Sequence, residues 1–281
     1  MRFARYHAIG NDYLVLRPDE IGEPTPNVIR LLCDRHAGVG SDGILIGPLN
    51  SRVCDFGLRI FNPDGSEAEK SGNGLRIFAR WLRDEGLVAD RPFTVETPGG
   101  VVTCTVAAVG KLIQVEMGEV RFDSTVIPVT GTPREVLNES LEIGGDTLTF
   151  CAATVGNPHC VVLTDDPTPE IATRLGPGIE VDPRFPNRTN VQFMTVIDRE
   201  NIRIEIWERG AGYTQASGSS STAAAAVAYR LNLCGPAITV HMPGGCIDIR
   251  LRDGFLATMA GPVRKICTGV VAEECLAQFS E

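Results

Sequence analysis

The chain has 281 residues, is 43% hydrophobic and carries a formal net charge of −9. This length allows two cores of ordinary size, and an acidic chain without a basic run argues against a nucleic-acid partner. The first residues lack the apolar core of a signal peptide, and no stretch reaches the roughly 20 apolar residues that span a bilayer, so we expect a cytoplasmic protein without a membrane partner.

Side chains that bind metals and common cofactors are sparse. The four histidines are far apart and outside any metal-binding pattern, and the nine cysteines lack CxxC spacing. No Walker loop occurs, and Gly72-Asn73-Gly74 is too short for a dinucleotide fingerprint. We therefore expect no metal and no cofactor.

The first half of the chain alternates between strand and helix patterns. We expect strands on both sides of the turn at 10–12, a helix over 27–35, a glycine-rich loop over 35–43, and strands over 44–46 and 58–62. A helix that ends near residue 86 and strands over 93–96, 101–107 and 111–117 follow. Residues 121–149, which contain Pro128, Pro133 and Gly144-Gly145, are expected to cross between two halves.

The second half shows a similar alternation. We expect a strand pair over 150–164 that is broken at 156–159, a helix over 168–175, and strands over 191–196 and 202–207. An alanine-rich helix over 222–231 comes next, residues 255–272 are expected to be rich in strands, and a short helix is expected over 273–279.

The turn before the alanine-rich helix is the first candidate site. It is poor in bulky side chains and lies between a strand with alternating isoleucines and the helix. The N–H groups of Gly218, Ser219 and Ser220 would point out of a helix start, where they could bind a carboxylate or a phosphate. The simpler alternative is that Ser217 to Thr222 only cap the helix.

The same strand, turn and helix pattern occurs earlier, around Ser71. The offset of 146 residues from Ser71 to Ser217 also carries Gly10-Asn11 onto Gly156-Asn157. Such a long period indicates a duplicated domain rather than a solenoid, with the two Ser-Gly turns facing each other across one cleft. We place the domains at 1–121, closed by 265–281, and at 122–264.

Several motifs in this order resemble the diaminopimelate epimerase family over nearly the whole chain. They are His7-Ala8-Ile9-Gly10-Asn11-Asp12-Tyr13, Arg35-His36-Ala37-Gly38-Val39-Gly40, Phe61-Asn62-Pro63-Asp64-Gly65-Ser66-Glu67, Gly72-Asn73-Gly74, Gly156-Asn157-Pro158-His159-Cys160, Arg188-Thr189-Asn190-Val191, Glu208-Arg209-Gly210-Ala211-Gly212 and Pro243-Gly244-Gly245. The resemblance implies an α+β fold of two pseudo-symmetric domains, each a β-rich, barrel-like sheet around a central helix, with the active site in the cleft between them. It also implies a cofactor-independent isomerase of lysine biosynthesis whose small-molecule substrate is an amino acid.

The resemblance assigns roles to individual residues. Ser71 and Ser217 occupy the positions of two cysteines that flank the substrate's α-carbon, and His159 and Glu208 occupy the positions beside those cysteines. The substrate-binding positions are Asn11, Asn62, Gly72, Asn73, Asn157, Asn190, Arg209, Gly218 and Ser219. Gly72-Asn73 and Gly218-Ser219 correspond to positions that bind the α-carboxylate, and the set of Asn62, Asn157, Asn190 and Arg209 suits the remote zwitterionic end.

The chain departs from the family pattern beyond the two serines. Glutamine is common at Gly43, glutamate is usual at Tyr213, and Gly-Ala-Cys is usual at Ser220-Ser221-Thr222. A laboratory replacement of two cysteines would not produce these further changes, so we favour natural divergence. An alcohol stays protonated at neutral pH, whereas a thiol titrates near pH 8.5, so each serine needs another base.

Three functions follow from these residues. The first is epimerisation at the α-carbon of diaminopimelate or a similar amino acid with a second polar end. The second is a one-sided proton abstraction that leads to dehydration or tautomerisation, and the third is an inactive amino-acid binder. An apolar sheet edge is compatible with a homodimer, although no specific pattern marks one.

Overall fold

The computed structural model describes residues 1–107 and 112–277, and the chain divides into two compact units. Unit 1 comprises Met1–Glu116 and Gly261–Glu281, and unit 2 comprises Met117–Ala260. Residue 111 of the expected strand and residues 278–279 of the expected last helix lie outside the described part of the chain. The predicted domains remain a prediction about which segments fold together independently.

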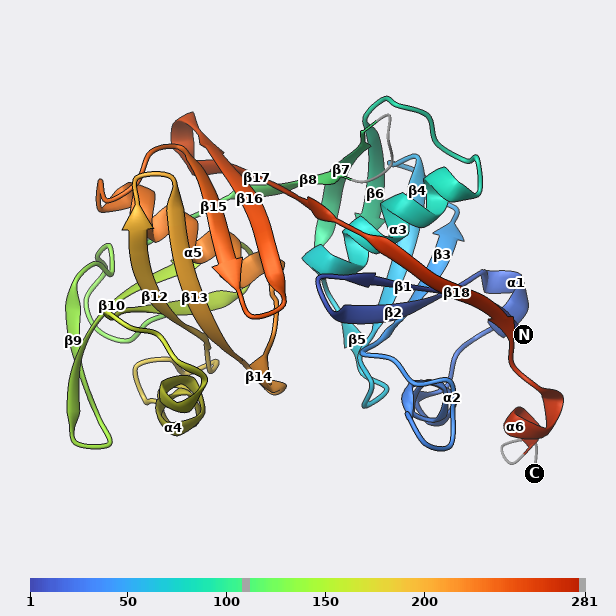
Figure 1. Ribbon diagram of the computed structural model, residues 1–281, viewed down its shortest axis with the longest axis horizontal. Helices are drawn as coiled ribbons and strands as arrows, with labels where there is room; N and C mark the ends of the chain where they lie inside the picture. The colour runs from blue at the N-terminus through green and yellow to red at the C-terminus, as the bar shows by residue number, and fades with distance from the viewer. Residues whose placement is uncertain (108–111, 278–281) are drawn as a thin grey trace. The chain divides into compact units, whose positions relative to one another are not determined.

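Unit 1 consists of strands packed against one long helix, α3 (Figure 1). Its helices are α1 (Pro18–Ile21), α2 (Pro26–Cys33), α3 (Gly72–Asp84) and α6 (Glu273–Ala277). Its strands are β1 (Arg2–Ala8), β2 (Asn11–Leu16), β3 (Ile44–Leu49), β4 (Phe56–Phe61), β5 (Glu67–Ala68), β6 (Phe93–Thr97), β7 (Gly100–Val106) and β18 (Arg264–Val270). Helix α3 contacts β1, β2, β3 and β7, and every residue from Asn73 to Leu82 except Arg80 is buried.

Unit 2 repeats this arrangement around α5 (Figure 1). Its helices are α4 (Pro169–Glu180), α5 (Gly218–Arg230) and the 3-10 turn η1 (Asp253–Phe255). Its strands are β9 (Glu139–Ile143), β10 (Asp146–Thr154), β11 (Pro158–Leu163), β12 (Asn190–Asp198), β13 (Asn201–Glu208), β14 (Gly212–Thr214), β15 (Ala237–Met242) and β16 (Gly245–Arg252). The residues of β8 (Leu112–Glu119) and β17 (Leu256–Pro262) extend over the two boundaries in the sequence.

The two units have the same order of strand pairings. In unit 1, β2 pairs with β3 and β4 with β6 in parallel, while β1–β2, β3–β4 and β6–β7 are antiparallel. In unit 2, the parallel pairs are β11–β12 and β13–β15, and β10–β11, β12–β13 and β15–β16 are antiparallel. This correspondence confirms the predicted α+β class with two pseudo-symmetric halves.

The composition of α5 follows from its surroundings. The helix contacts β10, β11, β12, β13, β15 and β16, and its residues from Ser220 to Ala228 are all buried. A helix that is buried on every side needs small side chains where strands approach closely, and the alanine run over 223–226 provides them. Helix α5 begins at Gly218 rather than at the predicted residue 222, because Ser220, Ser221 and Thr222 are its first turns and not a preceding loop.

Two other predictions were wrong. Residues 121–149 are not a crossing segment: they lie within unit 2, and Ile127, Val129, Val136 and Leu141 are buried in its core. The spacing of these apolar residues matches neither the period of a strand nor that of a helix, so the sequence did not indicate that they are buried. Helix α4 continues to Glu180, past Gly176-Pro177, because Ile179 is buried in the same core and stabilises the additional turn.

Candidate active site

Ser71 and Ser217 are the N-cap residues of the two central helices. The Ser71 Oγ accepts a hydrogen bond from the Gly74 N–H at 3.0 Å, and the Ser217 Oγ accepts one from the Ser220 N–H at 3.4 Å. Ser217 therefore caps its helix, as the simpler alternative expected, and Ser71 does the same in unit 1. Each serine oxygen lies at the positive end of a helix. The Ser220 N–H, which was expected to be open to a ligand, is occupied by Ser217.

Glu208 is the partner of Ser217. Alternation along β13 places Glu208 on the same face as Ile204 and Ile206, which is the face toward α5, and its carboxyl is hydrogen-bonded to the Ser217 side chain. Burial raises the pKa of the Glu208 carboxyl above its ordinary range, and the hydrogen bond with Ser217 opposes that rise. Unit 2 thus contains a carboxylate and a hydroxyl in direct contact, the arrangement of an activated hydroxyl.

His159 lies in the interior of unit 2. Its side chain is fully buried on β11, and its Nε2 is 3.0 Å from Asn157 Oδ1. Burial lowers the pKa of His159 to about 3, so its imidazole is neutral at physiological pH. Its neighbour Gln192 donates to Ser220 Oγ at 3.0 Å, which connects His159 to the start of α5.

Ser71 has a partner that the sequence did not suggest. The Tyr13 hydroxyl lies 3.2 Å from Ser71 Oγ, and the Tyr13 ring lies against Gly43. A Cβ at position 43 would lie 2.5 Å from Tyr13 Cε1 and 2.6 Å from the Phe61 carbonyl oxygen, so no side chain fits there. The departure from glutamine at position 43 was visible in the sequence and was the available indication of this ring.

Asparagine side chains form a network at the start of α3. The Asn11 Oδ1 accepts a hydrogen bond from Asn73 Nδ2 at 2.9 Å, and the Asn73 Oδ1 accepts one from Arg76. Arg76 is fully buried, and burial lowers its pKa to about 10. Its Nε and Nη1 have no hydrogen-bond partner among the residues that the structure describes. A buried positive charge therefore lies one turn behind Gly72 and Asn73.

The residues assigned to the remote end of a substrate differ in how their side chains are hydrogen-bonded within the protein. Asn190 holds two chain segments together: its Nδ2 donates to the Pro158 carbonyl at 2.9 Å and its Oδ1 accepts from the Arg209 N–H at 3.0 Å. The exposed Arg209 side chain donates to the Asn187 carbonyl at 3.0 Å. In unit 1, Asn62 follows β4 directly, and its Nδ2 donates to Ser66 Oγ at 3.0 Å.

The other departures from the family pattern are satisfied locally. The Tyr213 hydroxyl donates to Glu205 Oε2 at 2.7 Å on the face of β13 that is opposite to Glu208. The Ser221 and Thr222 hydroxyls donate to the carbonyls of Ser217 and Gly218, each four residues earlier in α5. These side chains therefore support the helix and the strand, whereas Tyr13 contacts the site serine itself.

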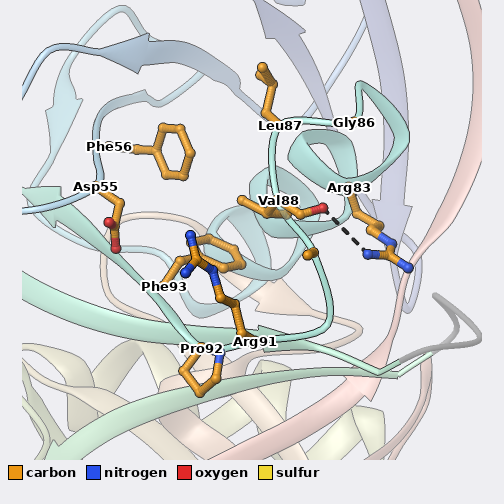
Figure 2. Close-up of a pocket in the computed structure, with 10 residues that line it drawn as sticks. Asp55, Phe56, Arg83, Gly86, Leu87, Val88, Arg91, Pro92 and Phe93 are labelled. Atoms are coloured by element: carbon orange, nitrogen blue, oxygen red, sulfur yellow. Dashed lines mark hydrogen bonds between the residues drawn. The ribbon is translucent and has the colours of Figure 1, made fainter.

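The cavity in Figure 2 contains none of the predicted site residues. It has a volume of about 440 Å³ and is lined by Asp55, Phe56, Arg83 and residues 86–89 and 91–93. Arg83 points to the Val88 carbonyl oxygen at 3.4 Å, and Asp55 is bound by Thr94. The cavity adjoins the C-terminal end of the 13-residue α3, roughly 20 Å from the Ser71 cap at its other end.

Two further observations concern metals and membranes. Among residues 1–107 and 112–277, no group of three or more His, Cys, Asp and Glu side chains is arranged to hold a metal ion. Within the same ranges, none of the helices has the length and apolar character needed to cross a membrane.

Comparison with known proteins identifies the family. The family model described as diaminopimelate epimerase matches residues 3–123 and 151–266. "Diaminopimelate epimerase 2" of Nostoc sp. (strain PCC 7120 / SAG 25.82 / UTEX 2576) is 57% identical over 278 residues, which cover 99% of this chain and 98% of that one. The diaminopimelate epimerase of Pelotomaculum thermopropionicum is 38% identical over 275 residues, 96% of this chain and 98% of the relative.

Solved structures share the fold. A probable proline racemase from Agrobacterium radiobacter K84 matches with a TM-score of 0.72 at 15% identity, over 97% of this chain and 93% of that chain. At such low identity the match shows that the fold is shared, while the family model and the two relatives show the family. The chain therefore belongs to the diaminopimelate epimerase family of isomerases.

Proposed function

We propose that the protein epimerises diaminopimelate at one α-carbon without a cofactor, with Ser71 and Ser217 serving the two faces of that carbon. The observation that carries this proposal is the contact between Ser217 and Glu208 at the start of α5, matched by the equivalent cap Ser71 at the start of α3. The names of the relatives supply the substrate, since both are diaminopimelate epimerases.

Proton removal is assigned to Ser217 and Glu208. The serine hydroxyl alone is too weak a base, but a carboxylate in contact can accept the serine proton while the serine oxygen takes the α-proton. Burial raises the pKa of Glu208, which makes its carboxylate a stronger base than an exposed one. His159 is assigned a supporting role through Asn157 and Gln192, because burial lowers its pKa and makes its imidazole a weak base.

Substrate binding is assigned to the helix starts and to the polar side chains around them. The α-carboxylate would be bound by first-turn N–H groups at Gly72-Asn73 and Gly218-Ser219, where helix dipoles also stabilise charge that develops on the α-carbon. Asn11 would support Asn73 through their hydrogen bond. Asn62, Asn157, Asn190 and Arg209 would bind the remote amino and carboxylate groups.

The first experiment measures the exchange of the substrate α-proton in deuterated buffer by NMR. Diaminopimelate and a panel of other amino acids would be incubated with the native protein and with Ser71→Cys/Ser217→Cys. We expect the native protein to exchange and invert diaminopimelate. If only the double cysteine variant exchanges the α-proton, the serines block the chemistry. If neither protein exchanges it, the proposal is contradicted.

Product analysis separates the other functions. A one-sided reaction changes the composition or the connectivity of the product, whereas epimerisation changes its configuration only. A binder would be stabilised thermally by diaminopimelate without any exchange. A cytoplasmic location, a homodimer and independent folding of 1–121 with 265–281 and of 122–264 remain further proposals, and analytical ultracentrifugation tests the dimer.

A further inference from the structure

Tyr13 is held in a fixed position next to Ser71. The residue lies on β2 and is 7% exposed, and its hydroxyl is 3.2 Å from Ser71 Oγ. The position of the ring depends on Gly43, because a Cβ at that residue would overlap Tyr13 Cε1 at 2.5 Å. Ring and glycine together therefore direct a phenol hydroxyl toward the cap of α3.

The hydrogen bonds of the two serines can have opposite polarity, because either hydroxyl can donate in the bond between Tyr13 and Ser71. A hydroxyl has one proton to donate and two lone pairs that accept. At Ser71 the Gly74 N–H occupies one lone pair, and a Tyr13 hydroxyl that donates would occupy the other, which leaves the Ser71 proton for a third partner. At Ser217 the partner Glu208 only accepts when it is ionised, so the Ser217 proton points to Glu208 and an oxygen lone pair stays available.

We propose that Tyr13 is the proton donor to Ser71, so that Ser71 and Tyr13 form the acid side of the site and Ser217 and Glu208 the base side. This inference rests on the proposed function. During inversion, Ser217 takes the α-proton and passes its own proton to Glu208, while Ser71 gives its proton to the opposite face and takes the proton of Tyr13. One C–H bond breaks and one forms, Glu208 ends neutral and Tyr13 ends as a phenolate, and proton exchange with water restores both.

A phenol next to Ser71 makes it easier for the serine to act as an acid. An alcohol that gives up its proton becomes an alkoxide, which is a far less stable anion than a phenolate, whose parent phenol has a pKa of about 10. Transfer from Tyr13 moves the negative charge from Ser71 to the ring. The Gly74 N–H at the helix start also stabilises the serine oxygen while that charge develops. The reverse reaction uses the same four groups in the opposite order.

The test compares inversion with α-proton exchange in Tyr13→Phe. LL- and meso-diaminopimelate are incubated separately in deuterated buffer, and configuration and deuterium content are followed together. Tyr6→Phe is the matched control, because Tyr6 is also buried in unit 1 but its hydroxyl donates to Asp84 at 2.9 Å. Thermal melting with and without diaminopimelate reports whether each variant keeps a folded binding pocket.

We expect Tyr13→Phe to invert at least tenfold more slowly, while exchange with retention persists from the stereoisomer whose α-proton faces Ser217. Tyr6→Phe should invert like the native protein. If Tyr13→Phe inverts as fast as the native protein, the role of Tyr13 is refuted and the proposed function stands. A native protein that neither exchanges nor inverts refutes both.

The native protein provides a second measurement that does not depend on a variant. LL- and meso-diaminopimelate are again used as separate starting materials. The unreacted starting material should gain deuterium faster when it is one of these stereoisomers than when it is the other, because only Glu208 and Ser217 form the resting base. Equal gain from both stereoisomers would overturn the assignment of an acid side and a base side.

Discussion

The starts of α3 and α5 share their backbone and differ in their partners. Ser71 has φ −137° and ψ 117°, and Ser217 has φ −144° and ψ 126°, so the two caps are nearly superimposable in conformation. Beside the first serine lie a phenol and, one turn into the helix, a buried arginine. Beside the second lie a carboxylate and a buried threonine, Thr222, at the position equivalent to Arg76. The two helix starts therefore have the same backbone conformation, and side chains on the neighbouring strands give each of them a different acid–base character.

The largest effect is expected at the base side. Glu208→Gln keeps the shape of the side chain but removes the proton acceptor, and loss of a positioned general base typically costs 10²- to 10⁴-fold in rate. We expect a fall of about that size in the inversion of diaminopimelate. Glu205→Gln is the control, since Glu205 is on the same strand but bonds Tyr213 on the opposite face. Equal losses in both variants would indicate a general disturbance of β13 and would remove Glu208 from the mechanism.

The pH dependence should report Glu208 and not His159. Glu208 acts as a base only when ionised, and burial raises its pKa, so kcat/KM should fall on the acid side at a higher pH than an ordinary glutamate would cause. The pKa of about 3 keeps His159 neutral throughout this range. The pH profile of His159→Asn should therefore retain the same acid limb. A limb that disappears in this variant would assign the titration to the histidine.

The buried arginine should affect binding more than folding. A buried charge without a carboxylate partner is costly, so Arg76→Met should leave the melting temperature unchanged or raise it. Without the arginine, Asn73 loses a donor and the carboxylate site loses nearby positive charge, so KM should rise about tenfold, equivalent to about 1.4 kcal/mol. Thr222→Val in unit 2 is the control and should leave KM unchanged. A KM for Arg76→Met that equals the native value would remove this electrostatic role.

The smallest effect is expected from the caps themselves. Ser71→Ala and Ser217→Ala each remove one hydrogen bond to a helix N–H, and the free energy of unfolding should fall by about 1 kcal/mol in each variant. The Ser217 bond is longer, so its loss should be the smaller of the two. Urea denaturation of both variants measures the difference. An unchanged unfolding free energy would mean that the serines are retained for chemistry alone.

Sequence patterns predicted the parts of the molecule that repeat. Strand alternation and the common offset from Ser71 to Ser217 identified the paired helix starts. The predicted strand ended at residue 207, so the place of Glu208 on the isoleucine face of β13 was seen in the structure. The buried segment around Ile127 and Val136 could not be found in this way, because its core residues follow neither period. The Tyr13 contact was also missed, since a contact between a strand and a distant helix cap has no local pattern.

The space at Gly43 restricts the order in which this site can change. A side chain at position 43 would meet the Tyr13 ring on one side and the Phe61 carbonyl oxygen, next to Asn62, on the other. Substitutions at 43 and 13 are therefore not independent: growth at 43 is tolerated only after the ring has become smaller and the end of β4 has shifted. An evolutionary or laboratory path toward a residue such as glutamine at 43 has to begin at Tyr13, and the opposite order passes through an overpacked intermediate.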